Sequence, residues 1–190
     1  MIKKFLLFVL TIVISLNSIA CANSEEKRSD ATAFIAFEFD PDSTEEKLLS
    51  LLTDGWHAFF RYNMVGEDKK IEIEMAVYEY GEKTYDDIVF SGLLSEEGTI
   101  AIIDNHGEIK IGIIDDNGSQ SVSIPYPIDI TAAGTGTRTA GGSAKDDPVP
   151  LLLVGIQNGV NETLSLGDPE LVGITKIAQA IDGLIVFYAK

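Results

Sequence analysis

Apolar and polar residues alternate along much of this chain, and this pattern constrains its fold more than any other feature. In the stretch KKIEIEMAVYEYGEK, residues 69–83, positions 71, 73, 75 and 77 are apolar, whereas positions 72 and 74 are Glu. Successive side chains of a strand point to opposite faces of its sheet. The stretch is therefore predicted to be a strand with one buried face.

Further segments have strand composition, being rich in aromatic and β-branched residues. They occupy residues 34–39, 56–63, 87–94, 99–104, 108–115, 121–126, 149–157 and 184–190. Gly, Asp and Asn separate many of them at intervals of about 8–12 residues, and no βαβ series is present. These features predict a mainly β chain that forms a single antiparallel β-sandwich-like domain with one or two short helices.

The motif Ile-Ile-Asp-x-x-Gly occurs twice, at residues 102–107 and 113–118, and it has two interpretations. An EF-hand-type calcium loop needs oxygen ligands at alternate positions and a Glu six residues after its Gly, and neither copy supplies this pattern. Asp or Asn followed by Gly is typical of a tight hairpin turn, because Gly adopts positive φ without steric cost. We therefore predict two turns and no metal site, with weak calcium binding at the surface as the alternative.

Two segments carry helix signals. Residues 41–55 contain Ser43 and Glu46 at capping-box spacing, followed by a Leu-rich stripe, which predicts a short helix. Residues 168–190 have two interpretations. Asp168-Pro169 could begin a helix that ends before a final strand, or Asp182-Gly183 could be the turn of a hairpin between two strands.

Residues 131–148 are Gly-rich, contain no large apolar side chain and end at Pro148. This composition predicts a mobile loop. A phosphate-binding loop is not expected, since no Gly-Lys-Ser/Thr motif occurs. Arg138 and Lys145 are candidate contacts through which the loop would order on a partner, and a passive spacer is the alternative.

The first residues have the pattern of an export signal. Lys3 and Lys4 precede an apolar run at residues 5–16, which is shorter than the ~20 residues that a membrane-spanning helix requires. We therefore predict a signal peptide at residues 1–20, a lipidated Cys21 with a flexible tether at residues 21–31, and a β-rich domain at residues 32–190.

The anchor is predicted from Ser18-Ile19-Ala20-Cys21, which resembles the lipobox of bacterial lipoproteins. With the signal and the polar tether, the chain resembles small exported lipoproteins of Gram-positive bacteria. The resemblance implies attachment through lipid on Cys21 to the outer face of the cell membrane, and it implies no ligand. Cys21 is the only cysteine of the chain, so it has no disulfide partner within it. Ala20-Cys21-Ala22 also fits ordinary signal peptidase, so secretion remains the alternative.

The charge of the chain excludes one class of partner. The formal net charge is −16, and it becomes more negative when a signal containing Lys3 and Lys4 is removed. Such a surface repels phosphate backbones, so nucleic acid is not expected as a partner. No cofactor motif is present, and no cofactor is expected.

The segment WHAFFRYN, residues 56–63, is the best candidate for recognition. Alternation places Trp56, Ala58, Phe60 and Tyr62 on one face and His57, Phe59 and Arg61 on the other. Burial of both faces would require partners for His57 and Arg61. His57, Phe59 and Arg61 are therefore candidate ligand or partner contacts, with core packing of both faces as the alternative.

No catalytic constellation stands out. The chain has two histidines, His57 and His106, and many carboxylates in its predicted loops and at strand ends: Asp40, Asp42, Asp86, Asp87, Asp146 and Asp147. We interpret these carboxylates as a solvated acidic surface. The sequence thus predicts a lipid-anchored extracytoplasmic protein that binds a ligand or an envelope protein without catalysis. An envelope hydrolase that uses His57 or loop carboxylates is the alternative.

Overall fold

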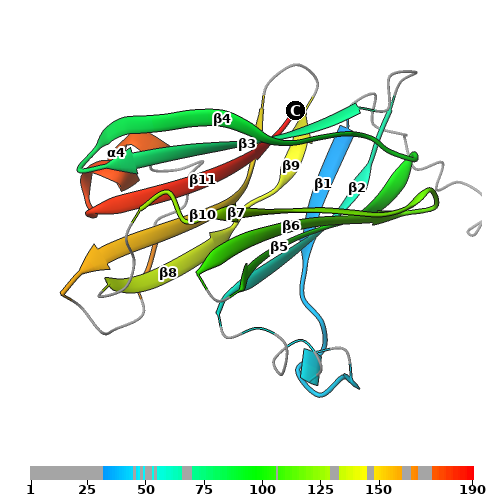
Figure 1. Ribbon diagram of the computed structural model, residues 1–190, viewed down its shortest axis with the longest axis horizontal. Coiled ribbons are helices and arrows are strands. Elements are labelled where there is room, and N and C mark those ends of the chain that lie inside the picture. Colours follow the sequence, from blue (N-terminus) through cyan, green and yellow to red (C-terminus); the bar gives the residue numbers. More distant parts are fainter. Residues whose placement is uncertain are drawn as a thin grey trace, which may run out of the picture. The chain divides into compact units, whose positions relative to one another are not determined.

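The computed structural model describes residues 32–44, 46–47, 49, 53, 55–65, 70–105, 107–128, 133–144, 148–159, 164–166 and 173–190. Residues 31–190 form one compact unit. The described strands form two antiparallel sheets in a sandwich-like arrangement (Figure 1), which confirms the predicted fold class.

Sheet A contains six strands and sheet B contains five, each pair of neighbours antiparallel. In spatial order, sheet A consists of β7 (Gly118–Pro125), β6 (Glu108–Asp115), β5 (Glu97–Asn105), β2 (His57–Asn63), β1 (Thr32–Phe37) and β9 (Gly142–Ala144). Sheet B consists of β4 (Glu82–Leu93), β3 (Lys70–Glu79), β11 (Gly183–Ala189), β10 (Val149–Asn158) and β8 (Ala133–Thr139).

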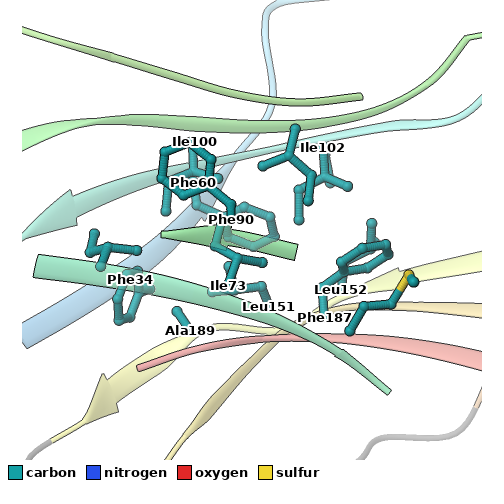
Figure 2. Packing of buried hydrophobic residues seen from close by; sticks show 14 of the residues in the cluster. Phe34, Phe60, Ile73, Phe90, Ile100, Ile102, Leu151, Leu152, Phe187 and Ala189 are labelled. Carbon is teal, nitrogen blue, oxygen red and sulfur yellow. The ribbon is translucent and has the colours of Figure 1, made fainter. Parts of the chain in front are cut away.

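The main core lies between the inner faces of the two sheets. Figure 2 shows Phe60 and Ile100 of sheet A together with Ile73 and Phe187 of sheet B, and all four side chains are fully buried. The alternation that predicted β3 is confirmed, because its apolar positions 71, 73, 75 and 77 are all in this core. Burial of such side chains stabilises the fold by about 1.5–3 kcal/mol each.

A second, smaller core covers the part of the outer face of sheet B around β10 and β11. It joins Leu184 and Val186 of β11 to Leu166 and to Ile177 of helix α4 (Ile174–Gln179). Strands β10 and β11 are therefore buried on both faces, which explains why their sequences are almost continuously apolar.

Both copies of the repeated motif are hairpin turns, as predicted. Asn105 pairs with Glu108 between β5 and β6, and Asp115 pairs with Gly118 between β6 and β7, so each turn has two residues. Gly107 and Gly118 have φ angles of +86° and +125°. In the second turn the Asn117 amide donates to Asp115 Oδ1 at 2.8 Å. Asp115 therefore serves as a turn residue.

Both helix signals have a counterpart in the structure. In the first, the Glu46 amide donates to Ser43 Oγ at 3.1 Å, and Thr44, Glu46, Lys47 and Leu49 are helical. In the second, α4 confirms a helix before the final strand and contradicts the hairpin. Asp182 instead accepts hydrogen bonds from Gln157 Nε2 at 3.0 Å and from the Asn158 amide at 2.8 Å, which ties the α4–β11 connection to β10. The predicted helix start at residues 168–169 lies outside the described residues.

The prediction of a loop over residues 131–148 is wrong, because β8 and β9 lie within this segment. β8 pairs with β10 from Ala133–Asn158 to Thr139–Leu152. Its glycines have a packing role. A Cβ atom on Gly136 would collide with the carbonyl oxygen of Leu164, so Gly allows residues 164–166 to cross directly over the strand.

Candidate functional site

A groove of about 590 Å³ crosses the outer face of sheet A, the face that points away from the main core. Residues of β1, β2, β5, β6 and β7 line it, and apolar side chains form much of its floor and one wall. Its volume is within the range of small-molecule sites, about 300–1,000 Å³. The groove is therefore large enough to hold a small ligand.

Strand register explains why this face is hollow. Phe59 on β2 is opposite Ala101 on β5, Ala101 is opposite Gly112 on β6, and Gly112 is opposite Ser121 on β7. Directly opposed residues of neighbouring antiparallel strands lie close together on the same face. One large side chain is thus followed by three small ones across the sheet, and the small residues form the floor.

The rows on either side of this floor carry larger side chains. On one side, Arg61 is opposite Thr99, and Thr99 is opposite Ile114. On the other side, Ile103 is opposite Lys110. The groove therefore has two flanks, with Arg61 on one and Lys110 on the other.

Three phenylalanines, which we call the aromatic wall, close the β1–β2 end of the groove. The ring centroids of Phe37 and Phe39 are 5.6 Å apart, those of Phe39 and Phe59 are 5.0 Å apart, and those of Phe37 and Phe59 are 5.8 Å apart. Such edge-to-face and tilted pairs contribute about 0.5–1.5 kcal/mol each beyond the area they bury. The wall is therefore a packed surface against which an apolar ligand could lie.

The groove carries two cationic side chains in a strongly acidic chain. The guanidinium of Arg61 lies over the Phe37 ring, 4.9 Å from its centroid, and both Arg61 and Lys110 are exposed. Within the described part of the chain, neither side chain forms an ion pair. Both positive charges are thus available to a ligand in the groove.

The structure brings the three candidate residues of β2 together on one face. Phe59 is 8% exposed because it packs within the aromatic wall, whereas Arg61 is exposed. The His57 ring centroid is 5.5 Å from that of Phe59, and its Nε2 is 3.5 Å from Glu46 Oε1. His57 does not line the groove itself. The opposite face of β2, with Ala58, Phe60 and Tyr62, is in the main core.

The remaining candidate residues are not part of the groove. Arg138 is a half-buried residue of β8 in sheet B, where its Nη1 donates to the carbonyl oxygen of Leu166 at 3.5 Å. It is therefore a strand residue, in contrast to its predicted place in a loop. Cys21 and Lys145 lie outside the described residues.

A polar contact fixes the hairpin that supplies part of the groove floor. Asp115 Oδ2 accepts hydrogen bonds from the Ser95 amide at 2.8 Å and from the Tyr62 hydroxyl at 3.3 Å. Burial, and then the Asp115 charge, raises the pKa of Tyr62 to about 12. The hydrogen bond from the Ser95 amide is the main cause that lowers the pKa of Asp115. The end of β6, and with it Gly112, is thereby tied to β2.

The carboxylates considered for catalysis have local structural roles where they are described. Asp86 and Asp87 lie within β4, in contrast to the expected strand end, and Asp86 Oδ2 is 2.7 Å from Lys83 Nζ. Asp40 Oδ1 accepts a hydrogen bond from the Asp42 amide at 2.9 Å. Asp146, Asp147 and His106 lie outside the described residues.

The described residues contain no group of three or more His, Cys, Asp or Glu side chains placed to hold a metal ion. They also contain no helix that is both long and apolar enough to cross a bilayer.

Of the residues that line the groove, only Phe59 and Arg61 were candidates from the sequence. Phe37, Ala101, Lys110 and Gly112 are among those that the sequence did not indicate. One signal could have revealed the pairing of Ala101 with Gly112. A two-residue turn at residues 106–107 fixes the register of β5 against β6, with Asn105 opposite Glu108. Counting the same number of residues away from the turn along each strand then places Ala101 opposite Gly112.

No protein-family model, no curated protein and no solved structure matches this chain.

Proposed function

We propose that the chain is a lipid-anchored extracytoplasmic protein that binds a ligand in the groove of sheet A without catalysing a reaction. One observation carries the binding role: a hollow of about 590 Å³ lies between the aromatic wall and the small residues of β5, β6 and β7. An apolar concavity with a few polar groups is typical of a small-molecule site. The hydrolase alternative uses His57 or loop carboxylates. His57 contacts Glu46 and Phe59. Within the described residues, no hydroxyl donates a hydrogen bond to His57, as the nucleophile of a nucleophile–base pair would.

The groove is tested by filling it. Gly112→Leu should weaken the binding of the uncharged dye N-phenyl-1-naphthylamine at least tenfold, measured by fluorescence titration, because the new side chain would occupy the floor. The nearest atom to a Cβ at this position is the Gln120 carbonyl oxygen at 4.0 Å, so the substitution has room at its base. A tenfold loss corresponds to about 1.4 kcal/mol.

Ser123→Leu is the matched control, because it adds the same side chain to the outer face of β7 at a position that does not line the groove. It should change dye affinity less than twofold. If the wild-type protein does not bind the dye, or if both variants bind it as well as wild type does, the groove is not a ligand site.

The anchor is supported by the lipobox-like residues 18–21 and by the single cysteine. Cys21→Ala should move the protein from the membrane fraction to the soluble fraction. Two acyl chains hold a protein stably at a bilayer, so wild-type protein should also resist a salt wash. The variant keeps the small residues at positions 20 and 22, and ordinary signal peptidase can therefore still release it.

Ser24→Ala, three residues beyond the cysteine, is the control and should remain membrane-bound. The mass of the mature wild-type protein should show the added lipid. Soluble wild-type protein that begins at Asn23 would rule out the anchor, and it would leave the ligand-binding role unaffected.

A further inference from the structure

We infer that the ligand of the groove is an amphipathic anion, with an apolar body on the groove floor and a carboxylate bound by Arg61. This inference rests on the proposed ligand-binding role and specifies the chemistry of the ligand. It follows from the placement of the cations and the nature of the floor and wall.

The floor and the aromatic wall select the body of the ligand. Ala101 and Gly112 present little polar surface, and the wall next to them consists of phenylalanine rings. Apolar surface removed from water contributes about 25 cal/mol per Å². An alkyl chain or a ring system fits this surface, whereas most polar groups of a sugar or a peptide backbone would lie against apolar side chains, with Thr99 and the Ser and Gln residues of β7 as the partners that the groove offers.

Arg61 selects the head group. Its guanidinium lies over the Phe37 ring, 4.9 Å from the centroid, and forms no ion pair within the described residues, so its N–H donors are open to a ligand. A planar guanidinium matches a carboxylate through two parallel hydrogen bonds. A neutral ligand that covered Arg61 would remove water from the guanidinium charge without supplying an anionic partner, and this desolvation opposes binding.

Lys110 adds a second positive charge on the opposite flank of the groove. A cationic ligand would meet repulsion from both flanks. It also could not stack on the Phe37 face that Arg61 covers. The groove chemistry therefore disfavours cations.

The acidic charge of the chain does not oppose this inference at contact distance. The formal net charge is −16, but charges more than about 8 Å apart are largely screened at physiological ionic strength. Arg61 acts on a bound carboxylate at hydrogen-bond distance. Local attraction therefore decides which head group binds, whereas the distant carboxylates mainly slow the approach of an anion.

The inference is tested with three ligands that share one chain length and differ in the head group. Decanoate, methyl decanoate and decyltrimethylammonium would each compete with N-phenyl-1-naphthylamine below their micelle concentrations. Wild-type protein should bind decanoate at least tenfold more tightly than methyl decanoate, and it should bind the ammonium compound more weakly than either.

Arg61→Gln should reduce the preference for decanoate over its ester to less than threefold, mainly because decanoate binds more weakly. Arg61→Lys, which keeps the charge and loses the fork, should retain part of the preference. Lys110→Gln should reduce the preference less than Arg61→Gln does. Lys176→Gln, on α4 beside sheet B, removes one positive charge from an exposed site and should leave the preference unchanged.

Thermal unfolding of each variant shows whether it is folded. The inference is overturned if wild-type protein binds the ester or the ammonium compound as tightly as decanoate, or if Arg61→Gln keeps the full preference. Either result, together with dye binding that Gly112→Leu abolishes, would leave the groove as a ligand site with a different specificity. If wild-type protein does not bind the dye at all, the proposed ligand-binding function is refuted.

Discussion

Phe60→Ala should lower the free energy of unfolding by about 3–5 kcal/mol, the range for removal of a fully buried aromatic side chain. Phe60 is fully buried at the centre of sheet A, where β2 lies between β1 and β5. Tightly packed neighbours from both sheets surround it, so the cavity can collapse only in part. Denaturant unfolding would measure the loss as a lower midpoint at an unchanged slope.

Phe59→Ala is the matched comparison, since it removes the same type of side chain from the preceding residue, which lies on the outer face of sheet A. It should cost less, about 1.5–3 kcal/mol, because the groove is open to water beside the site and no sealed cavity forms. It should also weaken dye binding, whereas Phe60→Ala should not do so in protein that remains folded. Equal losses of stability would mean that the aromatic wall is part of the core.

Gly136→Val should lower the free energy of unfolding by about 3 kcal/mol, at the upper end of what overpacking usually costs. A side chain at this position would collide with the backbone of Leu164, and a backbone atom cannot rotate away as the end of a long side chain can. The strand and the segment above it would have to separate, and the second core around Leu166 would open.

Thr137→Val, one residue further along β8 and exposed, is the control. It should change stability by no more than about 0.5 kcal/mol, as most surface substitutions do. If Gly136→Val were as harmless as Thr137→Val, β8 would not pack beneath residues 164–166, and the loop predicted from the sequence would be the better description.

The parts of the fold that depend on local patterns could be predicted from the sequence. Alternation identified β3, β5 and β6, because one face of each strand is buried and the other is not. The Asp-x-x-Gly motifs identified two turns, because positive φ at Gly107 and Gly118 is a local requirement.

β8 shows why another part was missed. Its Thr residues at 135, 137 and 139 alternate with Gly134, Gly136 and Arg138, which is a period of two. The Gly content outweighed this signal and favoured a loop. Gly is needed there because residues 164–166 cross the strand, and a contact between segments almost 30 residues apart leaves no local pattern.

Only part of the candidate site could be predicted, because the rest also depends on contacts between distant segments. Alternation placed Phe59 and Arg61 on one face of β2, which the structure shows. The wall that Phe37 and Phe39 complete depends on the pairing of β1 with β2, and the sequence between these strands does not fix that register by a short turn. The hollow also depends on the pairing of β7 with β6. Its lining comes from five strands, and the pattern of one strand alone therefore could not reveal it.

The two sheets differ in what covers their outer faces, and this difference has a consequence for how the protein can change. α4 and Leu166 cover the outer face of β10 and β11 in sheet B, so substitutions on either face of these two strands alter a core. On β2, β5 and β6, residues that face the main core alternate with residues on the outer face, and several of the outer residues line the groove. Groove residues can therefore be exchanged while the core residues beside them stay the same. Mutation and selection could retune ligand preference in single steps at the exposed groove residues, such as Arg61 and Lys110, with less loss of stability than a substitution in the main core would cause.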